Sequence, residues 1–222
     1  MKQKITRHSK AAIFVHWTVA ISTFLLLFSG FGQMPMYKRY NVVNIPGLSW
    51  ADNYLITIQI HYIAAAILIF AVVFHLIYHC KVGERAIIPR RGDVKESIQI
   101  VKAMFGFGEE PKSDKFLAEQ RLAYIFIGIN ILALIISGFI KVIQNIDPLL
   151  LPHNIYTLST AIHNLATIML IAGIAAHLMA FIIKENRPLF LTMFTGKVDY
   201  EYVKHRHSKW YDKLKKNNGI DV

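Results

Sequence analysis

Four long apolar stretches constrain the fold of this chain more than any other feature. They cover residues 11–31, 54–80, 122–142 and 155–183, and most of the charged residues lie between them. A bilayer core needs roughly 20 predominantly apolar residues in a helix, and a helix satisfies its own backbone hydrogen bonds in hydrocarbon. The sequence therefore predicts an all-α membrane protein, a bundle of four transmembrane helices, with residues 1–222 forming a single integral membrane domain.

Composition excludes several other classes of protein. The basic residues that give the net charge of +11 flank the apolar stretches, so they are better explained as loop residues of a membrane protein than as a nucleic-acid surface. No nucleic-acid partner is therefore expected. Cys80 is the single cysteine, which excludes a disulfide framework and a cysteine-ligated cluster on this chain. The first stretch follows a basic segment, as in a signal peptide. Its length and the lack of a cleavage motif instead indicate an uncleaved helix.

The distribution of Lys and Arg predicts the orientation. Residues 2–10 carry four, residues 81–121 nine and residues 184–216 another nine, whereas the other two connections carry only Lys38, Arg39 and Lys141. Positive residues concentrate on the cytoplasmic side. We therefore expect a multi-pass protein of the bacterial cytoplasmic (inner) membrane, in contact with its lipid, with both termini and the central loop in the cytoplasm.

Two basic segments outside the predicted spans carry patterns of their own. Residues Val94, Ile98, Val101 and Phe105 share one helical face, which predicts an amphipathic helix lying on the membrane or against a partner. The cytoplasmic tail, residues 184–222, contains "HRHSKWYDKLKK", and both membrane-surface anchoring and contact with a partner subunit are open interpretations.

Six of the ten histidines lie in or at the edge of the spans. They are His16, His61, His75, His79, His163 and His177. Ionisable residues inside a membrane are rare and usually functional, and six in one small bundle argue against coincidence. His79 lies near the headgroups, where a hydrated histidine is unremarkable. The remaining four, His8, His153, His205 and His207, are expected to be solvated.

The spacing of the membrane histidines predicts two sites at different depths. His163 and His177 are fourteen residues apart, so they share a helix face and lie about 21 Å apart along the axis. That separation suits two stacked haems. Span directions place His61 at the outer level with His163, and His16 at the inner level with His177. His75 also follows His61 by fourteen residues, so geometry leaves His16 and His75 as alternative inner partners.

Two glycines lie near the predicted outer site. "FSGF" (28–31) and "ISGF" (136–139) place Gly30 and Gly138 near the level of the outer histidines, where a glycine would let a flat ring approach the backbone. Ordinary packing of small residues between helices is an equally good explanation of either glycine. No convincing internal repeat is visible in the sequence.

Several motifs together resemble one family. They are "HW" at 16–17 after a basic arm, "QIHYIAAA" opening the second span, "KFLAEQR" before the third, H-x13-H in the fourth, and the tail "FTGKVDYEYVKHRHSKWYDKL". The chain resembles the cytochrome b (gamma) subunit of respiratory formate dehydrogenase and, more distantly, the cytochrome b of nickel–iron hydrogenases.

The resemblance implies cofactors, ligands and partners. It implies two b haems, with bis-histidine ligation by His16, His61, His163 and His177, and it favours His16 over His75. Electrons would pass from a ferredoxin-like iron–sulfur subunit at the outer face through both haems to menaquinone near the cytoplasmic face. Substrate oxidation would take place on a large catalytic subunit, and the complex could form a higher oligomer.

One departure from the family pattern concerns the quinone. The family motif before the third span resembles K-[FY]-N-A-G-Q-K, whose Asn and Gly line the quinone pocket. This chain has Leu117 and Glu119 at those positions, while Gln120 fits the motif. These three residues and His177 are the quinone-site candidates. Glu119 is hypothesised to supply a proton route to the reduced quinone.

Other interpretations remain at this stage. The chain could serve a nickel–iron hydrogenase or another iron–sulfur oxidoreductase, or act alone as a diheme quinol oxidoreductase. A histidine-lined metal transporter would need polar residues that the spans lack, and a purely structural anchor would bind no haem. Four basic residues near the inner surface are candidates to pair with haem propionates, although loop charge explains each one alone: Lys10, Arg121, Lys184 and Arg187.

Overall fold

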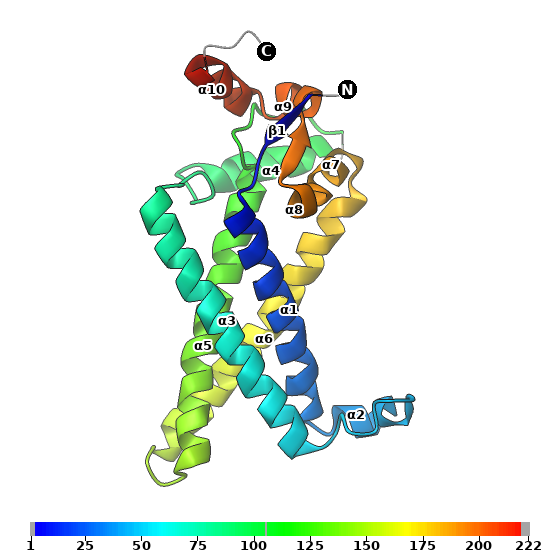
Figure 1. Ribbon diagram of the computed structural model, residues 1–222, viewed down its shortest axis with the longest axis vertical. Coiled ribbons are helices and arrows are strands. Elements are labelled where there is room, and N and C mark those ends of the chain that lie inside the picture. Colours follow the sequence, from blue (N-terminus) through cyan, green and yellow to red (C-terminus); the bar gives the residue numbers. More distant parts are fainter. Residues whose placement is uncertain (1–2, 105, 219–222) are drawn as a thin grey trace. The chain divides into compact units, whose positions relative to one another are not determined.

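The computed structural model describes residues 3–104 and 106–218, and most of them are helical (Figure 1). The four long helices are α1 (Lys10–Gly32), α3 (Tyr54–Val82), α5 (Ala118–Ile146) and α6 (His153–Met179). All four are long and apolar enough to cross a membrane. The four predicted helices are therefore confirmed, although their ends differ from the prediction by up to four residues.

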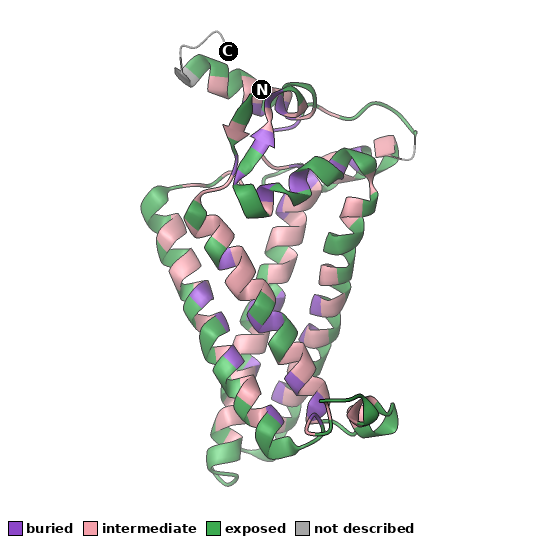
Figure 2. Cartoon of the chain, turned by 45° about the vertical axis from the view of Figure 1, so that its right-hand side comes forward, coloured by how far each residue is buried: buried purple, intermediate pink, exposed green. Residues whose placement is uncertain are grey.

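The long helices have the side-chain distribution of helices that face lipid. Large apolar side chains point outward, such as Phe24 at 55% exposed, Phe70 at 60% and Leu165 at 61%. Buried positions are few along each helix, and many are small or polar, such as Ser22 and Ala71 (Figure 2). In water this pattern would expose a large apolar surface, whereas in a bilayer the same surface contacts lipid tails.

The chain divides into two compact units, Lys10–Gly83 and Met1–Ser9 with Glu84–Val222. In the first unit, α1 and α3 form a hairpin joined through α2 (Met36–Arg39) and η1 (Val42–Asn44). A Cβ at Gly32 would lie 2.4 Å from the carbonyl oxygen of Ala51, so only glycine fits there. The Asn53 side chain caps α3 by accepting from the backbone N–H of Leu55, and Gly83 ends the helix at φ +67°.

The second unit contains the hairpin of α5 and α6, together with α4 (Asp93–Met104). The Ser159 hydroxyl donates to the carbonyl of Ser137 across the hairpin at 2.9 Å. Helix α4 is tied to the start of α5 by a buried ion pair, in which Arg121 donates to both oxygens of Asp93 at 2.6 and 2.8 Å. This hydrogen bonding holds the pKa of Asp93 below its usual range despite burial.

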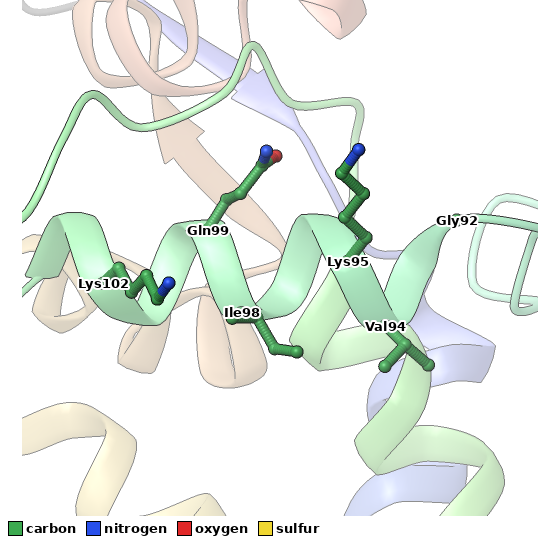
Figure 3. A pocket seen from close by; sticks show the side chains of 6 residues that line it. All are labelled: Gly92, Val94, Lys95, Ile98, Gln99 and Lys102. Atoms are coloured by element: carbon green, nitrogen blue, oxygen red, sulfur yellow. The ribbon is translucent and has the colours of Figure 1, made fainter.

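Helix α4 confirms the predicted helix and has two apolar faces. Ile100 is fully buried against Leu117, whereas Val94 and Ile98 are 63% and 53% exposed. Figure 3 shows Val94 and Ile98 on one side of α4 and Lys95 and Gln99 on the other, around a surface hollow. Phe105 lies outside the described residues. Contact of the exposed apolar face with membrane or partner stays a prediction.

The N-terminal arm and the C-terminal tail fold together within the same unit. Strands β1 (Lys4–Thr6) and β2 (Lys197–Asp199) pair antiparallel, a small sheet that the sequence did not predict (Figure 1). After α6 the chain continues with η2 (Ala180–Ile182), and the tail adds η3 (Lys184–Asn186), α7 (Arg187–Phe190), α8 (Thr192–Thr195), α9 (Tyr200–Arg206) and α10 (Ser208–Asn218). Leu189, Val198, Val203 and Trp210 form its core.

Candidate functional site

His61 is held by a serine and flanked by a glycine of the facing helix. In the α1–α3 hairpin, His61 Nδ1 lies 2.9 Å from Ser29 Oγ, and Ser29 is fully buried. A Cβ at Gly30 would lie 3.5 Å from the imidazole Cε1. Gly30 therefore lies directly beside the ring, although an alanine would make only ordinary van der Waals contact with it.

His163 has the same surroundings in the α5–α6 hairpin. Its Nδ1 lies 2.9 Å from Ser137 Oγ, and Ser137 is 2% exposed. A Cβ at Gly138 would lie 3.7 Å from the His163 Cε1. The sequence predicts both glycines near the level of these histidines, and within each hairpin the structure places the glycine beside the imidazole, where an added Cβ would reach the ring.

The two hairpins thus repeat one arrangement that the sequence interpretation missed. Each has a Ser-Gly pair on its first helix and, on its second, a histidine followed fourteen residues later by another, namely His75 in α3 and His177 in α6. The signal in the sequence is S-G followed by H-x13-H, which occurs once in each half of the chain. At 1.5 Å per residue, the two histidines of each helix are about 21 Å apart along its axis.

The remaining membrane histidines lie where the spans predicted. His16 is half-buried in α1 and makes an edge-to-face contact with Trp17, with ring centroids 5.3 Å apart. His177 lies in the last turn of α6 and makes a similar contact with Phe181 at 5.8 Å. His75 and His79 lie one turn apart in α3, with ring centroids 4.3 Å apart. The pairing of histidines from different units stays a prediction.

The quinone-site candidates Leu117, Glu119 and Gln120 gather at the start of α5. Leu117 is fully buried beside Ile100 and precedes the first helical residue. The Gln120 side-chain oxygen accepts from the Leu117 N–H at 3.2 Å and from Arg7 at 3.4 Å, so it caps the helix. Within the part of the chain that the structure describes, the buried Oε2 of Glu119 has no hydrogen-bond partner.

His207 corrects the expectation that the histidines outside the spans are solvated. It is fully buried, whereas His205 has a side chain 77% exposed. His207 Nδ1–H donates to the carbonyl of Asp114 at 2.7 Å, and Arg7 Nη1 lies 3.4 Å from Nε2. Burial, reinforced by the nearby Arg7 charge, lowers the pKa of His207 to about 4. The basic, aromatic tail is therefore at least partly a packing element. His8 is half-buried and His153 is exposed.

The buried cations of this region already have protein partners. Arg121, a candidate for a haem propionate, binds Asp93 and the carbonyl of Phe116. The guanidinium of Arg7 lies over the rings of Phe116 and Trp210, at 5.1 and 5.7 Å. These contacts account for both charges without a ligand, because each cation is paired or stacked where it is buried.

Comparison with known proteins identifies the family. The profile of the family described as prokaryotic cytochrome b561 matches residues 7–196. This chain belongs to that family. The cytochrome b556(Fdn) subunit of nitrate-inducible formate dehydrogenase from Escherichia coli K12 is 28% identical over 204 residues, covering 90% of this chain and 87% of that one. The formate dehydrogenase cytochrome b556 subunit of Haemophilus influenzae is 22% identical over 216 residues, covering 94% and 82%.

Membership confirms the resemblance and supports several of its implications. With four membrane-crossing helices, the chain is a multi-pass bacterial membrane protein, and a cytochrome b uses haem b for electron transport. The histidines fit that cofactor, because His61 and His163 are each held through Nδ1, which leaves Nε2 for the iron side of the ring. Among residues 3–104 and 106–218, no group of three or more His, Cys, Asp or Glu gathers to hold a metal ion by itself.

Proposed function

We propose that this chain is the diheme cytochrome b subunit of a respiratory formate dehydrogenase, with two bis-histidine b haems. The observation that carries the proposal is the Ser-Gly and His-x13-His arrangement, present once in each hairpin of a chain of this family. Its relatives, which are cytochrome b556 subunits of formate dehydrogenases, favour formate dehydrogenase over hydrogenase and over a stand-alone quinol oxidoreductase. The iron–sulfur and catalytic subunits would be the partners.

His61 and His163 would hold the haem at one level, and His16 and His177 would hold the haem at the other. The fourteen-residue spacing within α6 supports two levels about 21 Å apart. When bound, each haem supplies reversible one-electron transfer between ferric and ferrous iron. With two imidazoles bound to each haem, neither iron would have an open position for oxygen or substrate. Gly30 and Gly138 would border the first of these haems.

The orientation follows from the charge of the loops. Both termini and the central loop would lie in the cytoplasm of the bacterial cell, because 22 of the 25 Lys and Arg residues belong to these segments. Electrons would enter at the opposite face, and menaquinone or another quinone would be reduced near the cytoplasm. Transfer of charge in this direction, with proton uptake from the cytoplasm, would build membrane potential.

Haem spectra of ligand variants test the function. The purified wild-type chain should give the reduced α band of b-type haem with two haems per chain. Replacement of His61 or His163 by Ala should remove one haem, and replacement of His16 or His177 the other. His75→Ala is the matched control for His16→Ala, and it should retain both haems. A chain without haem, or one that loses haem with His75 rather than His16, contradicts the assignment.

Glu119 tests the quinone end of the proposal. Its buried carboxyl oxygen lies in the first turn of α5, where the family motif has an uncharged residue. Glu119→Gln should slow quinone reduction and change its pH profile, because a proton donor is lost while size is kept. Glu110→Gln, a change at a partly exposed carboxylate bound to Arg206, is the control. Quinone turnover that is unchanged across pH in Glu119→Gln refutes the proton role.

A further inference from the structure

We infer that Ser29 and Ser137 are positioning residues that fix the tautomer of His61 and His163, so that each imidazole presents Nε2 to a haem iron. The inference rests on the proposed function, in which these histidines ligate the same haem. Each serine is hydrogen-bonded to the histidine of its own hairpin.

Each serine hydroxyl has a single hydrogen to donate. Ser29 Oγ lies 2.7 Å from the carbonyl oxygen of Leu25, one turn earlier in α1, and Ser137 Oγ lies 2.6 Å from that of Ala133 in α5. Two oxygens approach this closely only with a hydrogen between them. A carbonyl has no hydrogen to give, so the serine must be the donor.

The direction of the second hydrogen bond follows. Each hydroxyl has used its hydrogen, so at the 2.9 Å contact with histidine the serine oxygen can only accept. Nδ1 of His61 and Nδ1 of His163 must therefore carry the ring proton. In a neutral imidazole the other nitrogen, Nε2, then carries the lone pair, which is the form that ligates a metal.

The burial of both serines makes this restraint strong. Ser29 is 0% and Ser137 is 2% exposed, so water does not compete for their hydroxyl groups. In the other tautomer, the unprotonated Nδ1 would face the serine oxygen. Two buried acceptors would then lie against each other without a hydrogen between them. The same arrangement on α1–α3 and α5–α6 places an equivalent restraint behind both ligands.

The restraint has an electronic consequence as well as a geometric one. An imidazole that donates from Nδ1 is a more basic ligand, and it stabilises ferric over ferrous iron. Loss of either serine hydroxyl should therefore raise the midpoint potential of the haem that His61 and His163 hold. Loss of this type of outer hydrogen bond also weakens metal binding by about 10- to 100-fold.

The experiment is an optical redox titration of the assembled complex, with haem content measured in parallel. Ser29→Ala and Ser137→Ala should each raise the potential of one haem, identified as the haem that His61→Ala removes, and should leave the other haem unchanged. The double variant should shift the same haem further. Ser29→Thr and Ser137→Thr retain a hydroxyl and should restore the wild-type potential.

Ser22→Ala provides the matched control. Ser22 is also buried in α1, at 1% exposed, and its hydroxyl likewise donates to a carbonyl one turn earlier, that of Thr18, at 2.7 Å. It should leave both potentials unchanged. If an alanine variant does not assemble, Ser29→Cys and Ser137→Cys supply the same test, because a thiol of similar size is a weaker acceptor.

The outcomes separate this inference from the proposed function. If the wild type holds both haems, His61→Ala and His163→Ala remove the same one, and the serine variants move no potential, the positioning role is wrong and the ligand assignment stands. If the wild type holds no haem, or His61→Ala and His163→Ala do not remove the same haem, the proposed function itself fails. A shift of equal size in Ser22→Ala also overturns the positioning role.

Discussion

Acidification should loosen the folded tail through one histidine, His207. Its pKa is about 4 in the folded protein, against an ordinary value of 6.5, because it is buried beside Arg7. A histidine with a lowered folded pKa stabilises the fold fully above pH 6.5. That stabilisation is lost as the pH falls from about 6.5 to about 4, because the unfolded tail then binds the proton more readily.

The size of the effect follows from the same two values. Their difference of about 2.5 corresponds to about 3 kcal/mol at about 1.36 kcal/mol per pKa unit, or about a 300-fold change in an opening equilibrium. The groups that act on the ring are the Arg7 and Arg206 guanidinium groups and the Asp114 carbonyl, and the Tyr202 ring packs against it. Asp114 itself, whose pKa its cationic neighbours lower to about 2, stays ionised across this window.

Hydrogen exchange followed by mass spectrometry measures the opening directly. Protection of peptides within residues 197–214, corrected for intrinsic exchange, should fall by about 100-fold between pH 7 and pH 4 in the wild type, because the folded His207 is half-protonated at pH 4. His207→Gln should be less protected at pH 7 and should lack this part of the pH dependence. His205→Gln, at an exposed site two residues away, should behave as the wild type. Parallel profiles for the wild type and His207→Gln would refute the reasoning.

Two other buried features give stability predictions that thermal unfolding in detergent can measure. Asp93→Asn leaves the buried Arg121 without its counter-charge, and it should cost about 3 kcal/mol or more and release α4 to proteases; proteolysis of α4 at the wild-type rate would contradict this. Gly32→Ala forces a methyl group to within 2.4 Å of the Ala51 carbonyl, and it should cost about 1–3 kcal/mol. Gly128→Ala is its control, because no atom lies within 4 Å of the added Cβ there; it should be neutral or stabilising by up to about 1 kcal/mol. A Gly32→Ala protein as stable as the control would show that the α1–α3 hairpin adjusts at no cost.

Local patterns in the sequence predicted much of the membrane region. The four helices could be predicted because hydropathy over about 20 residues is a local property of the sequence, and a helix of that length matches the thickness of the bilayer core. The separation of the two histidines along each helix follows from their spacing, because each helical residue rises by about 1.5 Å. The same reasoning predicted Gly30 and Gly138 near the histidines, and the structure places each beside one imidazole.

The same local reasoning failed wherever a residue's surroundings come from a distant part of the chain. His207 looked like a solvated tail residue, yet Arg7, 200 positions earlier, covers it. Leu117 was considered only as a departure from a quinone motif, but it packs against Ile100 of α4. Neither contact can be predicted from residue spacing within the tail or within the motif, because each partner lies elsewhere in the sequence.

The sequence by itself determined that this chain crosses a membrane four times and carries histidines at two depths in its fourth span. Membership of a cytochrome b family agrees with that. Only the tertiary structure decided which atom supports each histidine. The Ser29–His61 and Ser137–His163 bonds depend on how two helices rotate and slide against each other, and packing of the whole hairpin sets that register.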